Sequence, residues 1–174
     1  KDILKRNAQA QQHAFFLQHN AQFDKLNVHL GLRNTYYTET KKMYASPRIS
    51  AAYAVNDAWQ IKGAWSYYHQ FLRQSYHEDR FGRVFDFWVL GGNMAFPVAH
   101  SKNTMLGFRF LHDWFDLDVE FYQKNATGVI EHALEVTGFE KDEEMVTTSQ
   151  NAYKVFSGTG LTRGMVVLLK KTRG

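Results

Sequence analysis

Two segments of the chain alternate strictly between apolar and polar residues. They are residues 26–33 (LNVHLGLR) and 59–67 (WQIKGAWSY). A period of two residues is typical of a β-strand that has one face against an apolar environment and the other in water. Arg33 and Lys62 stand in the middle of the polar faces, where a dry core does not accept unpaired charges. The polar face is therefore expected to meet either bulk water or a water-filled lumen, with lipid against the apolar face.

The same pattern predicts an all-β chain of about seven antiparallel, up-and-down strands. The predicted strands are residues 14–23, 26–37, 46–55, 59–68, 104–111, 115–123 and 161–171. Residues 1–13 are polar and predict a loop or a short helix, so the predicted β-segment is 14–174. Two long stretches, near 69–103 and 124–160, are predicted to be irregular loops, with a β-like portion over 128–136.

Short and long connections alternate along the chain. Short turns are predicted at Asp24-Lys25, at residues 56–58 and at residues 112–114, and longer links separate them. In an up-and-down sheet all short turns then lie at one end, as in transmembrane β-barrels. Aromatic residues near the strand ends are consistent with interfacial girdles, although aromatic residues are also simply common in strands. They are Tyr36, Tyr37, Tyr44, Trp59, Tyr67, Tyr68, Trp114 and Phe115.

Composition narrows the classes of protein further. Aromatic residues make up 16% of the 174 residues, which is high for a soluble domain, whereas the net charge is only +4 and is scattered. Scattered cations give no nucleic-acid footprint. The absence of cysteine excludes disulfide scaffolds, thiolate zinc sites and cysteine nucleophiles. No apolar run reaches the roughly 18 residues of a transmembrane helix, but a barrel strand needs only about 9–11.

Ordered motifs resemble those of TonB-dependent outer-membrane receptors. Strand and hairpin motifs of that family are similar to residues 30–37 (LGLRNTYY), 46–50 (SPRIS), 55–59 (VNDAW) and 67–71 (YYHQF). Residues 86–89 (DFWV) and 96–98 (FPV) are similar to a loop of the Bacteroidetes-type receptors. Later matches are residues 106–108 (LGF), 117–124 (LDVEFYQK), 127–131 (TGVIE), 158–160 (GTG) and the pairs Arg163-Gly164 and Lys170-Lys171. The glutamate that the family pattern has near Val166 is missing.

The resemblance implies a section of a large transmembrane barrel, since such transporters have about 22 strands around a plug. No plug domain, TonB-box-like segment, signal peptide or closing strand is visible, and lipid does not tolerate open sheet edges. We therefore expect a middle part of a larger barrel. The implied function is energy-coupled uptake of a siderophore, cobalamin, haem or glycan across the outer membrane of a Gram-negative cell. The implied partners are lipid, the plug and remaining barrel, the TonB complex and a surface lipoprotein, with no cofactor.

The first candidate site is a set of cations and aromatic residues in the first long loop. Such a mixture suits an anionic siderophore, or stacking on a sugar or haem; the alternative is a solvated loop with a few salt bridges. His69 and His77 lack the spacing of helical metal ligands, so no metal site is predicted. The candidate ligand-binding residues are His69, Arg73, Tyr76, His77, Arg80, Arg83 and Trp88.

The second candidate set consists of charges on the polar faces of the predicted strands. These residues are expected to face the lumen, where they either pair across neighbouring strands or meet the plug. They are Arg33, Arg48, Lys62, Arg109, Asp118 and Glu120. The acidic residues 142–144 offer oxygen ligands for calcium but lack EF-hand spacing, so a solvated loop is expected.

No catalytic constellation is visible, and the chain is not expected to be an enzyme. An alternative of a different class is a soluble, lipocalin-like β-barrel that carries a hydrophobic ligand. Its apolar faces would point inward, and it would stay in solution without detergent. A third alternative is a porin or adhesin barrel that has no plug.

Overall fold

The computed structural model of the chain describes residues 9–78, 83–92, 96–135 and 152–172. Within these residues the secondary structure is entirely β. The strands are β1 (Gln12–Phe23), β2 (Leu26–Tyr37), β3 (Lys42–Ala54), β4 (Trp59–Gln70), β5 (Leu72–Glu78), β6 (Val84–Leu90), β7 (Ala99–Leu111), β8 (Phe115–Glu135) and β9 (Ala152–Lys171). Among the described residues there is no helix able to cross a membrane.

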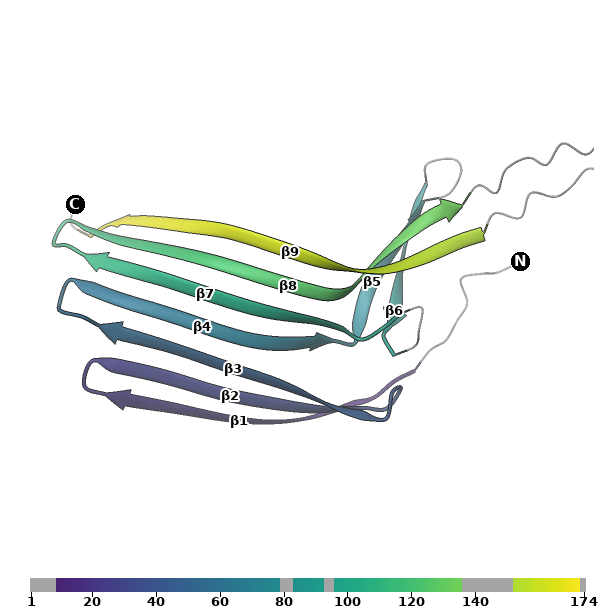
Figure 1. Ribbon diagram of the computed structural model, residues 1–174, viewed down its shortest axis with the longest axis horizontal. Coiled ribbons are helices and arrows are strands. Elements are labelled where there is room, and N and C mark those ends of the chain that lie inside the picture. Colours follow the sequence, from purple (N-terminus) through teal and green to yellow (C-terminus); the bar gives the residue numbers. More distant parts are fainter. Residues whose placement is uncertain (1–8, 79–82, 93–95, 136–151, 173–174) are drawn as a thin grey trace, which may run out of the picture.

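Seven strands form one antiparallel sheet in the order β1-β2-β3-β4-β7-β8-β9 (Figure 1). Strands β5 and β6 pair only with each other and form a hairpin inserted between β4 and β7. The turns β1–β2, β3–β4 and β7–β8 all lie at one end of the sheet, at the left in Figure 1, whereas the hairpin departs from the other end. We call these the short-turn end and the hairpin end. The predicted all-β, up-and-down fold is confirmed.

The strands are longer and more numerous than the alternation predicts. The stretch 69–103, expected to be irregular, contains β5, β6 and the first residues of β7. The expected loop near 124–160 begins and ends with paired backbone, because β8 has 21 residues and β9 has 20. The β-like portion predicted over 128–136 falls within β8 as far as Glu135, whereas residues 152–160 of β9 were not predicted as strand. The acidic residues 142–144 lie outside the described residues.

Local turn chemistry explains the tight connections. Asp24 adopts a positive φ of 42° in the two-residue turn between β1 and β2, a conformation that Asp tolerates better than most side chains. The turn between β3 and β4 is closed by Asn56, whose Oδ1 accepts hydrogen bonds from the backbone N–H groups of Ala58 and Trp59, at 3.0 and 2.8 Å. Both turns place the following strand in antiparallel register.

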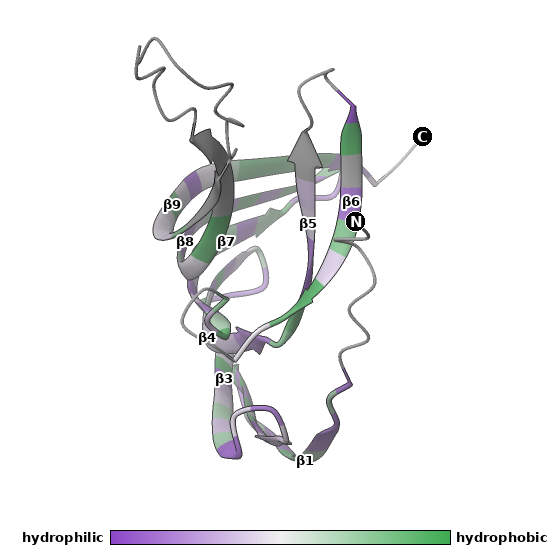
Figure 2. Cartoon of the chain, turned by 90° about the vertical axis from the view of Figure 1, so that its right-hand side faces the viewer, coloured by the Kyte–Doolittle hydropathy of each residue, from purple (hydrophilic) through white to green (hydrophobic). Residues whose placement is uncertain are grey.

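One face of the sheet is apolar and lies open. The strand registers put Leu106 opposite Phe121 and Phe121 opposite Met165, and these side chains are 61%, 49% and 58% exposed. Leu30, Ile49 and Ile61 continue this face across β2, β3 and β4. We call it the apolar face. Figure 2, coloured by hydropathy, shows apolar and polar segments alternating along the strands, with β5 and β6 standing apart.

On β7, β8 and β9 the run of apolar residues on this face is interrupted at the same height. Two residues beyond Leu106, Phe121 and Met165 on the same face stand Thr104, Gln123 and Arg163, which are again neighbours in register. Arg163 Nε donates a hydrogen bond of 2.8 Å to Gln123 Oε1. The apolar part therefore forms a band at the short-turn end of the sheet, and the strands continue past it toward the hairpin end.

Candidate binding surface on the charged face

The six charged residues expected to face a lumen lie on one face of the sheet, opposite the apolar face. In register, Arg48 is opposite Gly31, and Arg33 is opposite Ser46. Lys62 is opposite Gly107, and Gly107 is opposite Glu120. Arg109 is opposite Asp118. Because side chains alternate with a period of two, all six point to the same side. We call this side the charged face; that it faces a lumen stays a prediction.

Toward the short-turn end, the charges form ion pairs. Lys62 Nζ lies 2.7 Å from Asp118 Oδ2 and 2.5 Å from Glu120 Oε1. Arg109 pairs with Asp116, its Nε donating to Oδ1 at 2.8 Å. These side chains are half-buried, so their mutual attraction is screened less than that of an exposed pair. In this part of the face both cations therefore lie against carboxylates.

Arg33 and Arg48 differ from these cations. Among the residues that the structure describes, no carboxylate lies within ion-pair distance of either guanidinium. The Arg48 side chain lies across Gly31, where an added Cβ would collide with it. The two residues are diagonal neighbours on β2 and β3, and both side chains line the same hollow.

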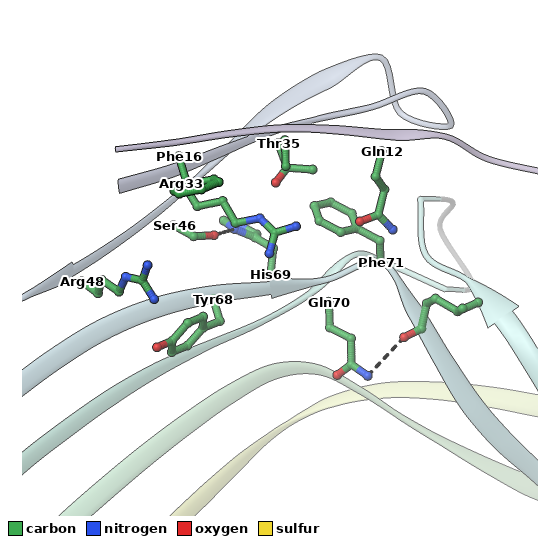
Figure 3. Close-up of a pocket in the computed structure, with 12 residues that line it drawn as sticks. Gln12, Phe16, Arg33, Thr35, Ser46, Arg48, Tyr68, His69, Gln70 and Phe71 are labelled. Atoms are coloured by element: carbon green, nitrogen blue, oxygen red, sulfur yellow. Dashed lines mark hydrogen bonds between the residues drawn. The ribbon is translucent and has the colours of Figure 1, made fainter. Parts of the chain in front are cut away.

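A hollow of about 700 Å³ lies on the charged face at the hairpin end (Figure 3). It is lined by residues from β1 to β3 and from the corner between β4 and β5. Ligand pockets in proteins typically have volumes of about 300–1,000 Å³. A smaller hollow of about 320 Å³ adjoins it and shares Arg48 and Tyr68. The larger hollow is lined by Gln12, Ala14, Phe16, Arg33, Thr35, Ser46, Arg48, Tyr68, His69, Gln70, Phe71 and Leu72.

His69 sits at the wall of this hollow. Its Nδ1 lies 3.2 Å from the Ser46 hydroxyl, and its ring centroid lies 5.0 Å from that of Tyr44 and 6.2 Å from that of His100. Burial lowers the pKa of His69 below its ordinary value, and the neighbouring His100 lowers it further. The imidazole is therefore neutral at pH 7 and both donates and accepts hydrogen bonds.

Phe71 links His69 to Tyr37, the only fully buried large side chain among the described residues. The Tyr37 ring centroid is 4.7 Å from that of Phe71, and Phe71 is 5.0 Å from Tyr44. These rings come from β2, β3 and the corner after β4. These packed rings lie beyond the apolar band, next to the hollow. They hold this part of the sheet in place, because packed aromatic side chains have few alternative positions.

The β5–β6 hairpin has two different faces. Ser75 and Val89 are buried, whereas Tyr76 and Trp88 on the opposite face are 60% and 66% exposed. Arg73, on the buried side, donates hydrogen bonds to the carbonyl oxygens of Pro97 and Gly128. Gly128 has a φ of 77° at a bulge in the β8–β9 ladder. This bulge makes its carbonyl available outside the ladder.

The predicted ligand-binding residues therefore occupy different places. His69 lines the hollow, Arg73 holds the hairpin, and Tyr76 and Trp88 share its exposed face. His77 lies on β5 opposite Phe85, and Arg83 precedes β6. Arg80 lies outside the described residues. Within the described part of the chain, no cluster of His, Asp and Glu is arranged to hold a metal ion.

Several lining residues were not predicted from the sequence. Gln12, Ser46 and Gln70 contribute polar groups, and Phe16 and Phe71 contribute rings. For Ser46 the sequence did contain a signal, because it lies two residues from Arg48 on the same predicted strand and therefore shares its face. The other residues become neighbours only through the register and through the corner after β4, which the sequence pattern does not encode.

Comparisons with known proteins give a consistent result. Residues 3–165 match the family described as TonB dependent receptor-like, beta-barrel. Similar folds are found in the siderophore receptor PirA from Pseudomonas aeruginosa (TM-score 0.65, 16% identity) and PirA from Acinetobacter baumannii (0.64, 17%). A mutant of the ferric enterobactin receptor PfeA from P. aeruginosa is also similar (0.66, 16%). No curated protein sequence gives a significant match.

The solved receptors are much longer than this chain. Between 90% and 99% of the chain is covered, but only 30%, 28% and 24% of the three receptor chains. At these identities the likeness concerns the fold. The family match extends over nearly the whole sequence and agrees with the resemblance inferred from the motifs. The chain belongs to the TonB-dependent receptor-like β-barrel family, and its seven-stranded sheet has the fold of a part of such a barrel.

Proposed function

We propose that the chain forms part of an outer-membrane receptor that takes up a nutrient in a TonB-dependent manner. The opposite chemistry of the two sheet faces carries this proposal. Apolar side chains such as Leu106 and Met165 are more than half exposed on one face, whereas ion-paired charges occupy the other. A continuous apolar band is a poor surface in water but suits the hydrocarbon of a bilayer. Family members are outer-membrane proteins, and we place this chain in the outer membrane of a Gram-negative cell, with the Bacteroidetes-type assignment resting on the loop motifs alone.

The proposed orientation follows from the connections. Short turns lie on the periplasmic side of such barrels and longer connections lie outside. The hairpin end would therefore face the cell exterior, and the charged face would line the lumen against the plug, which TonB acts on. A surface lipoprotein partner, if the receptor uses one, would dock at the hairpin end.

The proposed ligand surface combines the hollow with the exposed face of the hairpin. Tyr76 and Trp88 offer aromatic rings for stacking, and Leu72 continues their face into the hollow beside His69. Siderophore uptake is the first function to test, because the similar structures are siderophore receptors. Cobalamin, haem and glycans remain alternatives. A lipocalin-like carrier is disfavoured, since its hollow would lie on the apolar face, whereas this one lies among charged residues.

The test is expression of the protein in an outer membrane, followed by uptake assays. We expect the protein to fractionate with outer membranes, to migrate on gels in a heat-modifiable way, and to support uptake of a radiolabelled ferric siderophore. Uptake should disappear when TonB is deleted. Recovery of the chain as a monomer that is soluble without detergent would instead support the carrier.

A further inference from the structure

The boundary between β3 and β4 is paired over only part of its length. Their ladder begins beside the short turn and stops at Arg48 opposite Ser66. Beyond this point β3 keeps its pairing with β2, and β4 keeps its pairing with β7, up to the hairpin end of each strand. Figure 1 shows β3 and β4 side by side at the short-turn end and diverging toward the hairpin end. We call the unpaired stretch, residues 42–47 of β3 and 67–70 of β4, the seam.

Pro47 explains why the ladder stops at the seam. Residues of an antiparallel strand direct their N–H and C=O groups alternately toward the two neighbouring strands. The Val55 N–H donates to the carbonyl oxygen of Trp59, and the register has no shift, so the odd-numbered residues of β3 face β4. The next pair after Arg48 would be Pro47 opposite Tyr67. Proline has no N–H, and its ring occupies the place of the hydrogen, so this rung cannot form.

Side chains hold the two edges of the seam together. Ser46 Oγ of β3 lies 3.2 Å from His69 Nδ1 of β4. The Tyr44 ring centroid lies 5.0 Å from that of His69 and 5.0 Å from that of Phe71, and Tyr37 of β2 packs on Phe71. These contacts hold the closed arrangement. They can separate without breaking any strand pairing, whereas a backbone ladder fixes neighbouring strands about 4.8 Å apart.

The hollow of about 700 Å³ lies across the seam. Arg33 and Thr35 line it from β2, whereas Gln70 and Leu72 line it from the end of β4 and from β5. Figure 3 shows Thr35 and Gln70 on opposite sides of the hollow. A change in the separation of β3 and β4 at the seam therefore changes the width of the hollow.

We propose that the wall of the receptor is hinged at Pro47, and that strands β1–β3 and strands β4–β9 swing apart and together beyond it, opening and closing the hollow. The side chains that meet across the seam form the latch of the closed state. The β5–β6 hairpin moves with the β4 side, because Arg73 ties it to the segment before β7 and to β8. Its base touches the β2–β3 turn only through contacts such as that of Gly92 with Glu39. The hinge belongs to the wall itself and does not depend on which nutrient the receptor takes up.

The experiment measures distances in the intact receptor in lipid nanodiscs, by double electron–electron resonance between spin labels on two introduced cysteines. The chain itself has no cysteine, and any cysteine in the remaining receptor is replaced by serine. The K42C/T162C pair labels β3 and β9 toward the hairpin end, and the A52C/K170C pair labels the same two strands toward the short-turn end. We expect a broad or bimodal distance distribution for the first pair and a narrow one for the second.

Pro47→Val supplies the missing N–H and should extend the ladder into the seam. We expect it to narrow the K42C/T162C distribution, to leave the A52C/K170C distribution unchanged, and to slow amide exchange of residues 67–69 by about tenfold or more. Ala45→Val is the matched control. Ala45 lies on the same edge of β3 and already has an N–H, so this variant adds bulk without a new donor and should keep the broad distribution.

Two results would overturn the hinge. One is an equally narrow distribution for both label pairs in the unmodified receptor, which would mean that the seam is rigid. The other is a P47V variant that behaves as A45V does, which would mean that the missing donor is not the cause. Membrane fractionation and heat modifiability test the proposed function separately, so a rigid seam in a correctly inserted receptor contradicts the hinge alone.

Discussion

Lys62 Nζ lies 2.7 Å from Asp118 Oδ2 although strand β7 separates the two residues. The lysine reaches β8 because Gly107, opposite Lys62 on β7, has no side chain. An added Cβ at Gly107 would lie 3.0 Å from Lys62 Cε and 2.9 Å from the Val119 carbonyl oxygen. The ion pair therefore connects three strands through a gap that one glycine provides.

Gly107→Ala is expected to destabilise the barrel wall, because the new methyl group pushes on both the Lys62 stem and the backbone of β8. The loss should be roughly 1–3 kcal/mol, the usual range for overpacking. Urea unfolding in detergent micelles gives the measurement. Gly63→Ala is the control, since its Cβ would meet only Met105 O at 3.7 Å. Equal losses in the two variants would contradict the explanation.

Lys62→Met should leave Asp118 and Glu120 close together without their cation. We expect a loss of about 1–2 kcal/mol, less than for a fully buried pair because these side chains are partly exposed. The triple variant K62M/D118N/E120Q should recover most of that loss, since no unpaired carboxylate remains. The same unfolding assay compares the two. A triple variant as unstable as K62M would show that the lysine acts through packing alone.

Arg73→Gln should loosen the β5–β6 hairpin without unfolding the sheet. The substitution removes the guanidinium that donates to the carbonyls of Pro97 and Gly128. Hydrogen exchange followed by mass spectrometry should show faster exchange in residues 72–78 and 84–90 and no change in β2 or β3. Gln74→Ala, on the opposite hairpin face, is the control. Unchanged exchange in the R73Q hairpin would mean that other contacts hold it.

Stability at the hairpin end should fall in acid because of His69. Its pKa in the folded protein is lowered by burial and by His100, so the folded state binds fewer protons than the unfolded state. Stability then rises with pH. The loss of stability begins as the pH falls through the ordinary histidine pKa of 6.5, where the unfolded chain takes up a proton. It is complete below the lowered pKa of His69 in the folded protein. The His69 ring is contacted by Ser46 and Tyr44 of β3, by Tyr67 of β4 and by His100 of β7. Arg33 lines the same hollow.

His69→Gln should flatten the pH dependence between pH 7 and pH 5, because the group that takes up the proton is gone. Thermal unfolding in a pH series is the measurement. His29→Gln, an exposed position that contacts Asn20, is the control and should keep the slope. If the H69Q profile is as steep as that of the unmodified protein, another group is responsible.

The sequence pattern predicted strand boundaries best where a strand has a turn at each end and a continuous apolar face between them. The predicted strand 26–37 coincides with β2. It was less complete where strands leave the apolar band. The β-like portion predicted from residue 128 falls within β8, but residues 124–127 of β8 and residues 152–160 of β9 were not predicted as strand. It also missed β6, whose Val89 is buried while Trp88 is exposed, so that both faces carry apolar residues.

For the charged residues, the sequence likewise predicted the face of the sheet on which they lie but not their partners. That Arg33, Arg48 and Lys62 share a face follows from strand parity and was predictable. Within the described residues Lys62 is ion-paired and Arg48 is not. This difference depends on which residues lie opposite Gly107 and Gly31, and register is a property of the assembled sheet. Whether these residues serve a ligand stays a prediction.

The direct pairing of β4 with β7 separates the wall of this barrel from the hairpin that it carries. Their ladder is continuous from Trp59 opposite Phe110 to Gln70 opposite Ala99, and β5 and β6 take no part in it. Insertions, deletions or exchanges between Phe71 and Val98 therefore leave every strand register of the wall unchanged. The β5–β6 hairpin can therefore be exchanged as a single segment, while the seven-stranded sheet keeps its pairing.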